Sequence, residues 1–169
     1  IGIHIHLSET EKEVNDCITQ HGKRPAVHLD ECGILTPRTT AAHCCWLDQE
    51  ECTLLGKRGV SASHNPSSNM KLATNRAMPY HWLKAAGANV CLGTDGCASN
   101  NNLDMFEEAK TAALLQKFSW NNPVLLPAHE ALRMATENGA KGLGLATGTL
   151  VAGTPADIIL VSTRIACNT

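Results

Sequence analysis

Apolar and polar positions follow two alternating periods along the chain. Short stretches predict strands at 1–6, 38–44, 60–64 and 88–92, and the first of them is apolar and rich in β-branched residues. The stretches between them have a helical period and charged faces, and they predict helices at 9–22, 26–32, 48–58 and 79–86. Several of these helices end at a glycine, which is a common helix stop signal. The first half of the chain therefore consists of regular strand–helix units.

The remaining residues change in character. Two longer helices are predicted at 103–118 and 127–143, the second with Pro127 in its first turn, where proline is tolerated. The stretches 148–153 and 156–161 predict two strands joined by a Gly-Thr-Pro turn, which is a β-hairpin. Turn-forming residues predict loops at 65–69 and 93–100.

Four strand–helix units in succession predict a parallel sheet covered by helices. Four units are half of an eight-stranded (β/α) barrel, which typically needs about 250 residues. The alternative is a small, open, doubly wound sheet. No glycine fingerprint follows the first strand, so nothing favours a dinucleotide-binding fold. The length of 169 residues fits one main domain.

Composition narrows the classes of function. The chain is 43% hydrophobic and 18% charged, which argues against intrinsic disorder. The net charge is −2 with no basic stripe, which argues against a nucleic-acid partner. No apolar run approaches the roughly 20 residues of a membrane helix, and no leader pattern is seen. The eight cysteines form no CxxC pair and are expected to be reduced thiols, so we expect a cytoplasmic protein without membrane contact.

Four ionisable residues fall at or just after the carboxyl ends of the four predicted strands. They are His6, His43, His64 and Asp95, separated by 37, 21 and 31 residues. In a parallel barrel this end of the strands carries the active site. Imidazole and carboxylate ligands suit a hydrolytic zinc ion, with iron as an alternative. Such an ion lowers the pKa of bound water to about 7.

Each of these residues also has a plainer explanation. His43 alone fits a core histidine, His64 precedes an Asn-Pro turn, and Asp95 alone fits an Asx-turn. The other histidines on predicted helices are expected to be surface or packing residues: His21, His28, His81 and His129. The combined pattern is more specific than any single member.

The motifs that surround these residues make the pattern specific. They are His6-Leu7-Ser8-Glu9, Ala42-His43-Cys44, Ser63-His64-Asn65-Pro66-Ser67-Ser68-Asn69-Met70-Lys71-Leu72, Leu92-Gly93-Thr94-Asp95-Gly96-Cys97-Ala98-Ser99-Asn100, and later Met134–Ala140 and Gly153–Asp157. Over essentially the whole chain, this set resembles the amidohydrolase superfamily. Within it, the chain is similar to the branch of 5-methylthioadenosine/S-adenosylhomocysteine deaminases and related chlorohydrolases.

The resemblance implies a role for each site residue. His6 and Asp95 would bind the metal, and Asp95 would also act as general base. Glu9 would hold the purine ring and relay a proton to it, and His43 would polarise the attacking hydroxide. Glu9, His43 and Asp95 are thus expected to contact substrate and carry the catalysis. His64 would support them without binding the metal.

The resemblance also implies an architecture. Residues 1–145 would be the second half of a TIM-type (β/α)8 barrel, strands five to eight, and 146–169 the start of a flanking β-sandwich domain. The first-strand His-x-His pair of the family would then lie outside this chain, and His4 would be a strand neighbour rather than a ligand. The loop segments 67–71 and 100–102 are expected to be structural. The family's glycine is replaced at Asn75-Arg76, where asparagine tolerates a left-handed backbone.

The implied activity is metal-dependent hydrolytic deamination of an adenosine-like nucleoside, which releases ammonia and the inosine analogue. Such an enzyme would serve purine salvage, and a homo-oligomer is expected. Within the superfamily, the alternatives are a 5′-deoxyadenosine deaminase, a guanine deaminase or a triazine chlorohydrolase. A truncated domain without activity is the alternative outside enzymes. A half barrel exposes two strand edges, so the chain alone is expected to fold poorly or pair with a second copy, and to bind metal weakly.

Overall fold

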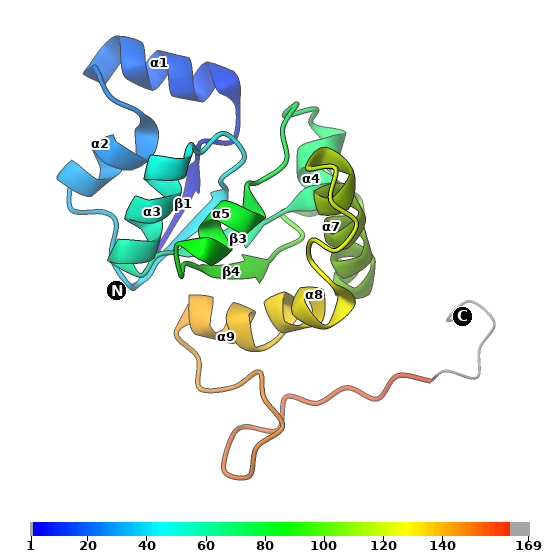
Figure 1. The fold of residues 1–169 in the computed structure, drawn as a ribbon. Coiled ribbons are helices and arrows are strands. Elements are labelled where there is room, and N and C mark those ends of the chain that lie inside the picture. Colours follow the sequence, from blue (N-terminus) through cyan, green and yellow to red (C-terminus); the bar gives the residue numbers. More distant parts are fainter. Residues whose placement is uncertain (1, 163–169) are drawn as a thin grey trace.

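The computed structural model describes residues 2–162, which form a parallel sheet covered by helices (Figure 1). The sheet has the order β1-β2-β3-β4, and each neighbouring pair of strands is parallel. The strands are β1 (Ile3–Leu7), β2 (Thr39–His43), β3 (Ser61–His64) and β4 (Asn89–Leu92). The predicted parallel sheet of four strand–helix units is therefore confirmed.

Helices follow each strand, close to the predicted positions. They are α1 (Glu11–His21), α2 (Pro25–Glu31), α3 (Gln49–Arg58), α4 (Pro66–Lys71), α5 (Tyr80–Ala85), α6 (Cys97–Asn100), α7 (Met105–Ser119), α8 (Ala128–Ala135) and α9 (Glu137–Leu143). In Figure 1, α1 and α2 lie at the end of the molecule opposite α7 and α8. Within the described residues, no helix is long and apolar enough to cross a membrane.

Burial differs between the strands. Every residue of β2, β3 and β4 is buried, whereas β1 alternates between half-buried and exposed positions up to Leu7. A parallel strand that is covered on both faces is buried throughout, and β1 lies at one end of the described sheet. His4 and His6 therefore stand on the open face of β1. The core between sheet and helices includes Leu47, Leu55 and Met78.

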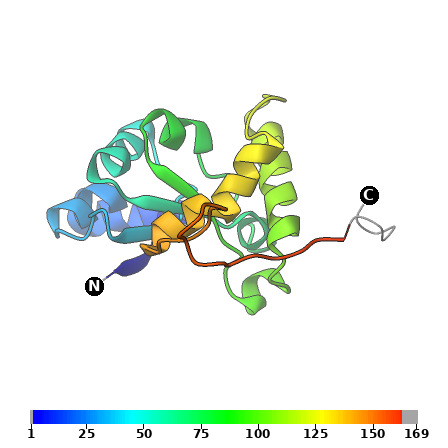
Figure 2. The same ribbon diagram turned by 90° about the horizontal axis from the view of Figure 1, so that it is seen from below.

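Helix α9 closes the amino-terminal end of the sheet, and Figure 2 shows it crossing the strands from below. The Thr40 hydroxyl donates to the Gly142 carbonyl at 2.8 Å. A Cβ on Gly142 would lie 3.4 Å from both Ser61 and Cys91, so the small residue permits this close packing. The carboxyl ends of the strands, where the candidate residues lie, are on the opposite side from α9.

The prediction of a single helix at 127–143 is wrong, because the helix is interrupted at Thr136 and divides into α8 and α9. Thr136 leaves the helical region, with φ −121° and ψ −97°. Beyond the break, the Asn138 amide donates to the Val90 carbonyl at 2.9 Å, and Asn89 donates to the Asn138 carbonyl at 3.0 Å. These bonds to β4 fix the direction of α9 by tertiary contact, which the local periodicity does not contain.

The prediction of loops at 65–69 and 93–100 is also wrong in part, because the short helices α4 and α6 occupy much of these two stretches. Pro66 is the first residue of α4, where its fixed φ favours a helix start. The interpretation of Asn75 is confirmed, because its φ is 63°, in the left-handed region.

The β-hairpin predicted at 148–153 and 156–161 is absent from the described structure. Figure 1 shows this segment leaving α9, making a loop and then continuing as an extended chain. The hydroxyl of Thr147, just before this segment, donates to Asp157 within it at 2.7 Å, and Leu150 and Leu160 are exposed. A two-stranded hairpin without a covering layer is marginal in water, which explains the failed prediction. The rest of the predicted β domain, 163–169, lies outside the described residues.

The seven cysteines of the described region are free thiols, in agreement with the prediction, and Cys167 lies outside it. Burial raises the pKa of Cys45 and of Cys52 to about 12. These thiols therefore stay protonated near neutral pH, as small core residues do.

Candidate active site

The carboxyl ends of the strands surround a cavity of about 390 Å³. Three of the predicted site residues line it, namely His6, His43 and Asp95. They come from β1, from β2 and from the turn after β4, so the parallel sheet has brought together residues far apart in sequence. His4 also lines the cavity, beside His6.

The backbone bends sharply where these residues leave the sheet. Ser8, His43 and Asp95 have positive φ values of 49°, 71° and 61°. Non-glycine residues adopt this conformation rarely, and such positions cluster at functional sites. The geometry therefore supports a functional role for this rim of the sheet.

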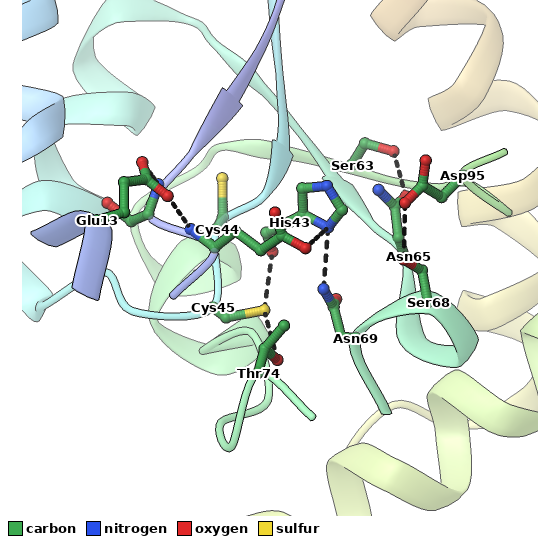
Figure 3. Close-up of polar contacts among 12 residues, drawn as sticks. Glu13, His43, Cys44, Cys45, Ser63, Asn65, Ser68, Asn69, Thr74 and Asp95 are labelled. Atoms are coloured by element: carbon green, nitrogen blue, oxygen red, sulfur yellow. Dashed lines mark hydrogen bonds and ion pairs between the residues drawn. The ribbon is translucent and has the colours of Figure 1, made fainter. Parts of the chain in front are cut away.

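His43 lies at the centre of the group (Figure 3). Its ring stacks on that of His6, with centroids 5.3 Å apart and planes at 12°. Its Nδ1 lies 2.9 Å from the Asn69 amide nitrogen and 3.7 Å from Glu9 Oε1. Burial lowers the pKa of His43, and the nearby carboxylates of Glu9 and Asp95 oppose this effect. A neutral ring is therefore favoured.

Asp95 is held by two hydrogen bonds. The Ser68 hydroxyl donates to Oδ2 at 2.7 Å, and the Gly96 amide donates to Oδ1 at 2.6 Å. Partial burial favours a higher pKa for Asp95, but these two bonds hold its pKa below the ordinary value. The carboxylate is thus ionised and fixed in direction.

Glu9 is positioned through its backbone. The Glu13 carboxylate accepts from the amides of Ser8 and Glu9 at 2.6 and 2.8 Å, while Thr10 Oγ1 accepts from the Glu13 amide at 3.2 Å. This arrangement caps α1 and fixes the turn that carries Glu9. The Thr10-x-x-Glu13 spacing is the signal from which sequence reasoning could have found it.

His64 lies away from the cavity. It is fully buried, and its Nε2 is 3.2 Å from the Gln116 amide nitrogen, which also donates to the Met78 carbonyl. Burial lowers the pKa of His64 to about 3, so the ring is neutral. It joins β3 to α7 beneath the site.

Sequence reasoning treated 67–71 and 100–102 as structural only, yet Ser68 and Asn69 contact Asp95 and His43 directly. Both lie on α4. The buried Glu108 carboxylate accepts from the Ser67 amide at 3.4 Å and from Asn100 at 2.7 Å, which joins α4 to the segment after Asp95. No local sequence signal predicts these contacts, because the partners are distant along the chain.

Glycine is required at the turn that leads to Asp95. A Cβ at Gly93 would lie 2.5 Å from Asn65 Oδ1 and 2.8 Å from the Ser63 hydroxyl. Both of those side chains line the cavity. The Gly93-Thr94-Asp95 motif therefore has a steric reason as well as a chemical one.

The cavity is lined by side chains of the types that zinc binds, since imidazole and carboxylate are among its usual ligands. Within the described residues, however, no three histidine, cysteine, aspartate or glutamate side chains gather closely enough to hold a metal ion. His6 and Asp95 would supply two ligands.

The parallel sheet thus brings two histidines, a glutamate and an aspartate, residue types that can hold metal ions and move protons, to its carboxyl edge. The chain belongs to the amidohydrolase family, whose model matches residues 1–169. Its α/β fold is of the amidohydrolase type.

Curated relatives and solved structures agree with this family. The chain is 74% identical over 169 residues to 5′-deoxyadenosine deaminase of Methanoregula boonei, and 54% identical over 161 residues to 5-methylthioadenosine/S-adenosylhomocysteine deaminase 1 of Archaeoglobus fulgidus. These matches cover 100% and 95% of the chain, and 38% of each relative. A zinc-bound adenosine deaminase from Xanthomonas campestris superposes with a TM-score of 0.89 at 43% identity, over 93% of this chain and 36% of that structure. The chain thus spans well under half the length of these relatives.

Proposed function

We propose that the protein to which this chain belongs is a metal-dependent aminohydrolase that deaminates an adenosine-like nucleoside. The observation that carries the proposal is the convergence of Glu9, His43 and Asp95 at one edge of the sheet, with His43 and Asp95 held by direct hydrogen bonds. The names of the relatives support the substrate class, since they are deaminases of 5′-deoxyadenosine, 5-methylthioadenosine and S-adenosylhomocysteine.

The general base is Asp95. Its carboxylate is ionised and fixed by Ser68 and Gly96, so it is ready to accept a proton from the attacking water. The water then adds to the ring carbon that bears the amino group. Asp95 returns its proton to the departing nitrogen, and the C–N bond breaks as ammonia leaves. The added hydroxyl becomes the ring carbonyl, and its proton replaces the one that Glu9 gives to the ring nitrogen.

Glu9 and His43 act on the ring and on the new oxygen. Glu9, in its protonated form, donates a proton to the ring nitrogen next to the carbon under attack, which removes the negative charge that develops there. His43 offers a fixed hydrogen bond to the oxygen that adds to the ring. Glu9 lies 3.7 Å from His43, so the two side chains serve adjacent atoms of one substrate.

The metal of this proposal is zinc, with iron as the alternative. When bound, it would act as a Lewis acid and lower the pKa of the attacking water. His6 and Asp95 would hold it from this chain, and the other ligands would come from the rest of the protein. Zinc in the Xanthomonas campestris adenosine deaminase and in the Arthrobacter aurescens atrazine chlorohydrolase supports this choice.

The proposal includes a position in the barrel. We assign β1–β4 to strands five to eight and the segment from 146 onward to the start of a β-sandwich domain. The order of the motifs supports this assignment. A structure of the complete protein tests it directly. If β1–β4 were the first strands of the barrel, the assignment would be wrong.

The cellular setting belongs to the proposal as well: a homo-oligomeric enzyme of purine salvage in the cytoplasm, with a small nucleoside as its partner. Gel filtration of the complete protein checks the first of these statements, since a monomer at micromolar concentration would contradict it.

The test of the activity is ammonia release by the zinc-loaded complete protein from 5′-deoxyadenosine, 5-methylthioadenosine, S-adenosylhomocysteine and adenosine. Release from at least one, lost on chelation and restored by zinc, supports the proposal. No release from any, with zinc bound, rejects the nucleoside and moves the search to guanine and halogenated triazines.

A further inference from the structure

Asn69 is a buried polar residue that the catalytic steps above do not use. Its side chain projects from α4 toward His43, and the residue is 3% exposed. The amide nitrogen lies 2.9 Å from His43 Nδ1, whereas the amide oxygen has no hydrogen-bond partner among the described residues. This contact connects α4 to the ring at the centre of the site.

The direction of the Asn69 amide follows from the partners that each orientation leaves unpaired. With nitrogen toward His43, the carbonyl oxygen and one of the two N–H donors have no partner among the described residues. In the reverse orientation, the NH₂ group would occupy the position without a partner, which leaves two buried donors unpaired. Buried donors without partners are rarer and costly, and under-satisfied carbonyls are less rare. The orientation in which nitrogen faces His43 is therefore favoured.

This orientation decides where the proton of His43 lies. A ring nitrogen that accepts a hydrogen bond carries no proton, so a neutral imidazole must carry its proton on the other nitrogen. We infer that Asn69 fixes His43 as the Nε2–H tautomer, so that His43 donates a hydrogen bond into the cavity it shares with His6 and Asp95. Asn69 is thus a positioning residue that acts through His43.

Glu9 competes for the same nitrogen. Its Oε1 lies 3.7 Å from His43 Nδ1, and a carboxylate there favours a proton on Nδ1. The amide of Asn69 is closer, at 2.9 Å, and it allows no proton at that position. If its donor is removed, Nδ1 gains a proton directed at a carboxylate, and Nε2 turns a lone pair toward the cavity. The expected result is an acceptor where the reaction needs a donor.

The tautomer can be measured directly. The complete, zinc-loaded protein is labelled with ¹⁵N-histidine, and ¹H–¹⁵N correlation spectra distinguish protonated from unprotonated ring nitrogens. The His43 signals are those lost in His43→Gln. We expect Nε2–H in the unmodified protein and Nδ1–H in Asn69→Asp, whose carboxylate accepts where the amide donated. Asn122→Asp, at an exposed position, should leave the His43 signals unchanged. A proton on Nδ1 in the unmodified protein would overturn the inference.

The catalytic consequence rests on the proposed function and has its own readout. Asn69→Asp is expected to lower kcat about 100-fold, as removal of an oxyanion-directed donor does, with KM within about twofold. Asn122→Asp should retain both parameters. An unchanged kcat in Asn69→Asp would reject the role of Asn69, whereas absence of ammonia release from the unmodified enzyme would reject the proposed function and leave the tautomer measurement intact.

Discussion

The two sides of the cavity are built differently. On the β2–β4 side, α4 holds both His43 and Asp95 through consecutive residues, since Ser68 donates to Asp95 and Asn69 to His43. On the β1 side, His4 and His6 are exposed. Glu9 is fixed there through its backbone by Glu13, and its carboxylate stands 3.7 Å from His43.

The difference teaches where the precision of the site comes from. Hydrogen bonds from the buried Ser68 and Asn69 side chains fix Asp95 and His43 before any substrate arrives, which is the basis of preorganised catalysis. The β1 side lies at one end of the described sheet, and its partners belong, in our proposal, to the remaining length of the protein. A six-residue helix, α4, therefore carries much of the positioning within this chain.

The largest effect is expected for Asp95→Asn on the β2–β4 side of the cavity. An amide accepts no proton from water at neutral pH, so kcat for ammonia release by the complete protein should fall about 10⁴-fold. Asp157→Asn, on the exposed tail, is the matched control and should keep full activity. Retention of more than about a tenth of the activity in Asp95→Asn would remove Asp95 as the base.

Glu9→Gln tests the β1 side of the cavity. Without an ionisable carboxyl group, proton delivery to the ring nitrogen is lost, and kcat should fall about 10³-fold. Glu11→Gln, in the first turn of α1, provides the control with the same change of charge. An unaffected kcat would mean that Glu9, on the β1 side, holds substrate without taking part in proton transfer.

Ser68→Ala tests the β2–β4 side by removing one of the two hydrogen bonds to Asp95. Loss of a hydrogen bond to a carboxylate should lower kcat/KM about tenfold, equivalent to about 1.4 kcal/mol. It also raises the pKa of Asp95, because the ionised form loses a donor. The acid limb of the pH profile, where the base becomes protonated, should therefore move to higher pH. Ser119→Ala, at an exposed position, should leave both the rate and the limb unchanged.

The last effect concerns stability beneath the site, with no direct effect on the proposed catalysis. Burial lowers the pKa of His64 to about 3, against about 6.5 in an unfolded chain, so the unfolded state binds the extra proton between these values. The contribution is present above about pH 6.5 and is lost as pH falls toward 3, by up to about 1.4 kcal/mol per unit. Urea unfolding of the complete protein at pH 7 and 5 measures this slope. His64→Gln should reduce it and the exposed His129→Gln should not; equal slopes in all three would contradict the account.

The sequence by itself determined the alternation of strands and helices and the residues at the strand ends. Both depend on local periodicity and on a general property of parallel sheets, which gather their carboxyl ends at one edge. His6, His43 and Asp95 could therefore be assigned to one cavity before the structure was known. The motif resemblance then predicted the family, and the family comparison confirmed it.

Only the tertiary structure decided which groups hold these residues. Ser68 and Asp95 are 27 positions apart and Asn69 and His43 are 26 apart, so their hydrogen bonds exist only when α4 packs over the strand ends. The break at Thr136 likewise depends on bonds from Asn138 to β4. The tail failed as a hairpin because its pattern encodes apolar faces but not the layer that would cover them. Local patterns specify elements, whereas hydrogen-bond partners depend on packing between distant segments.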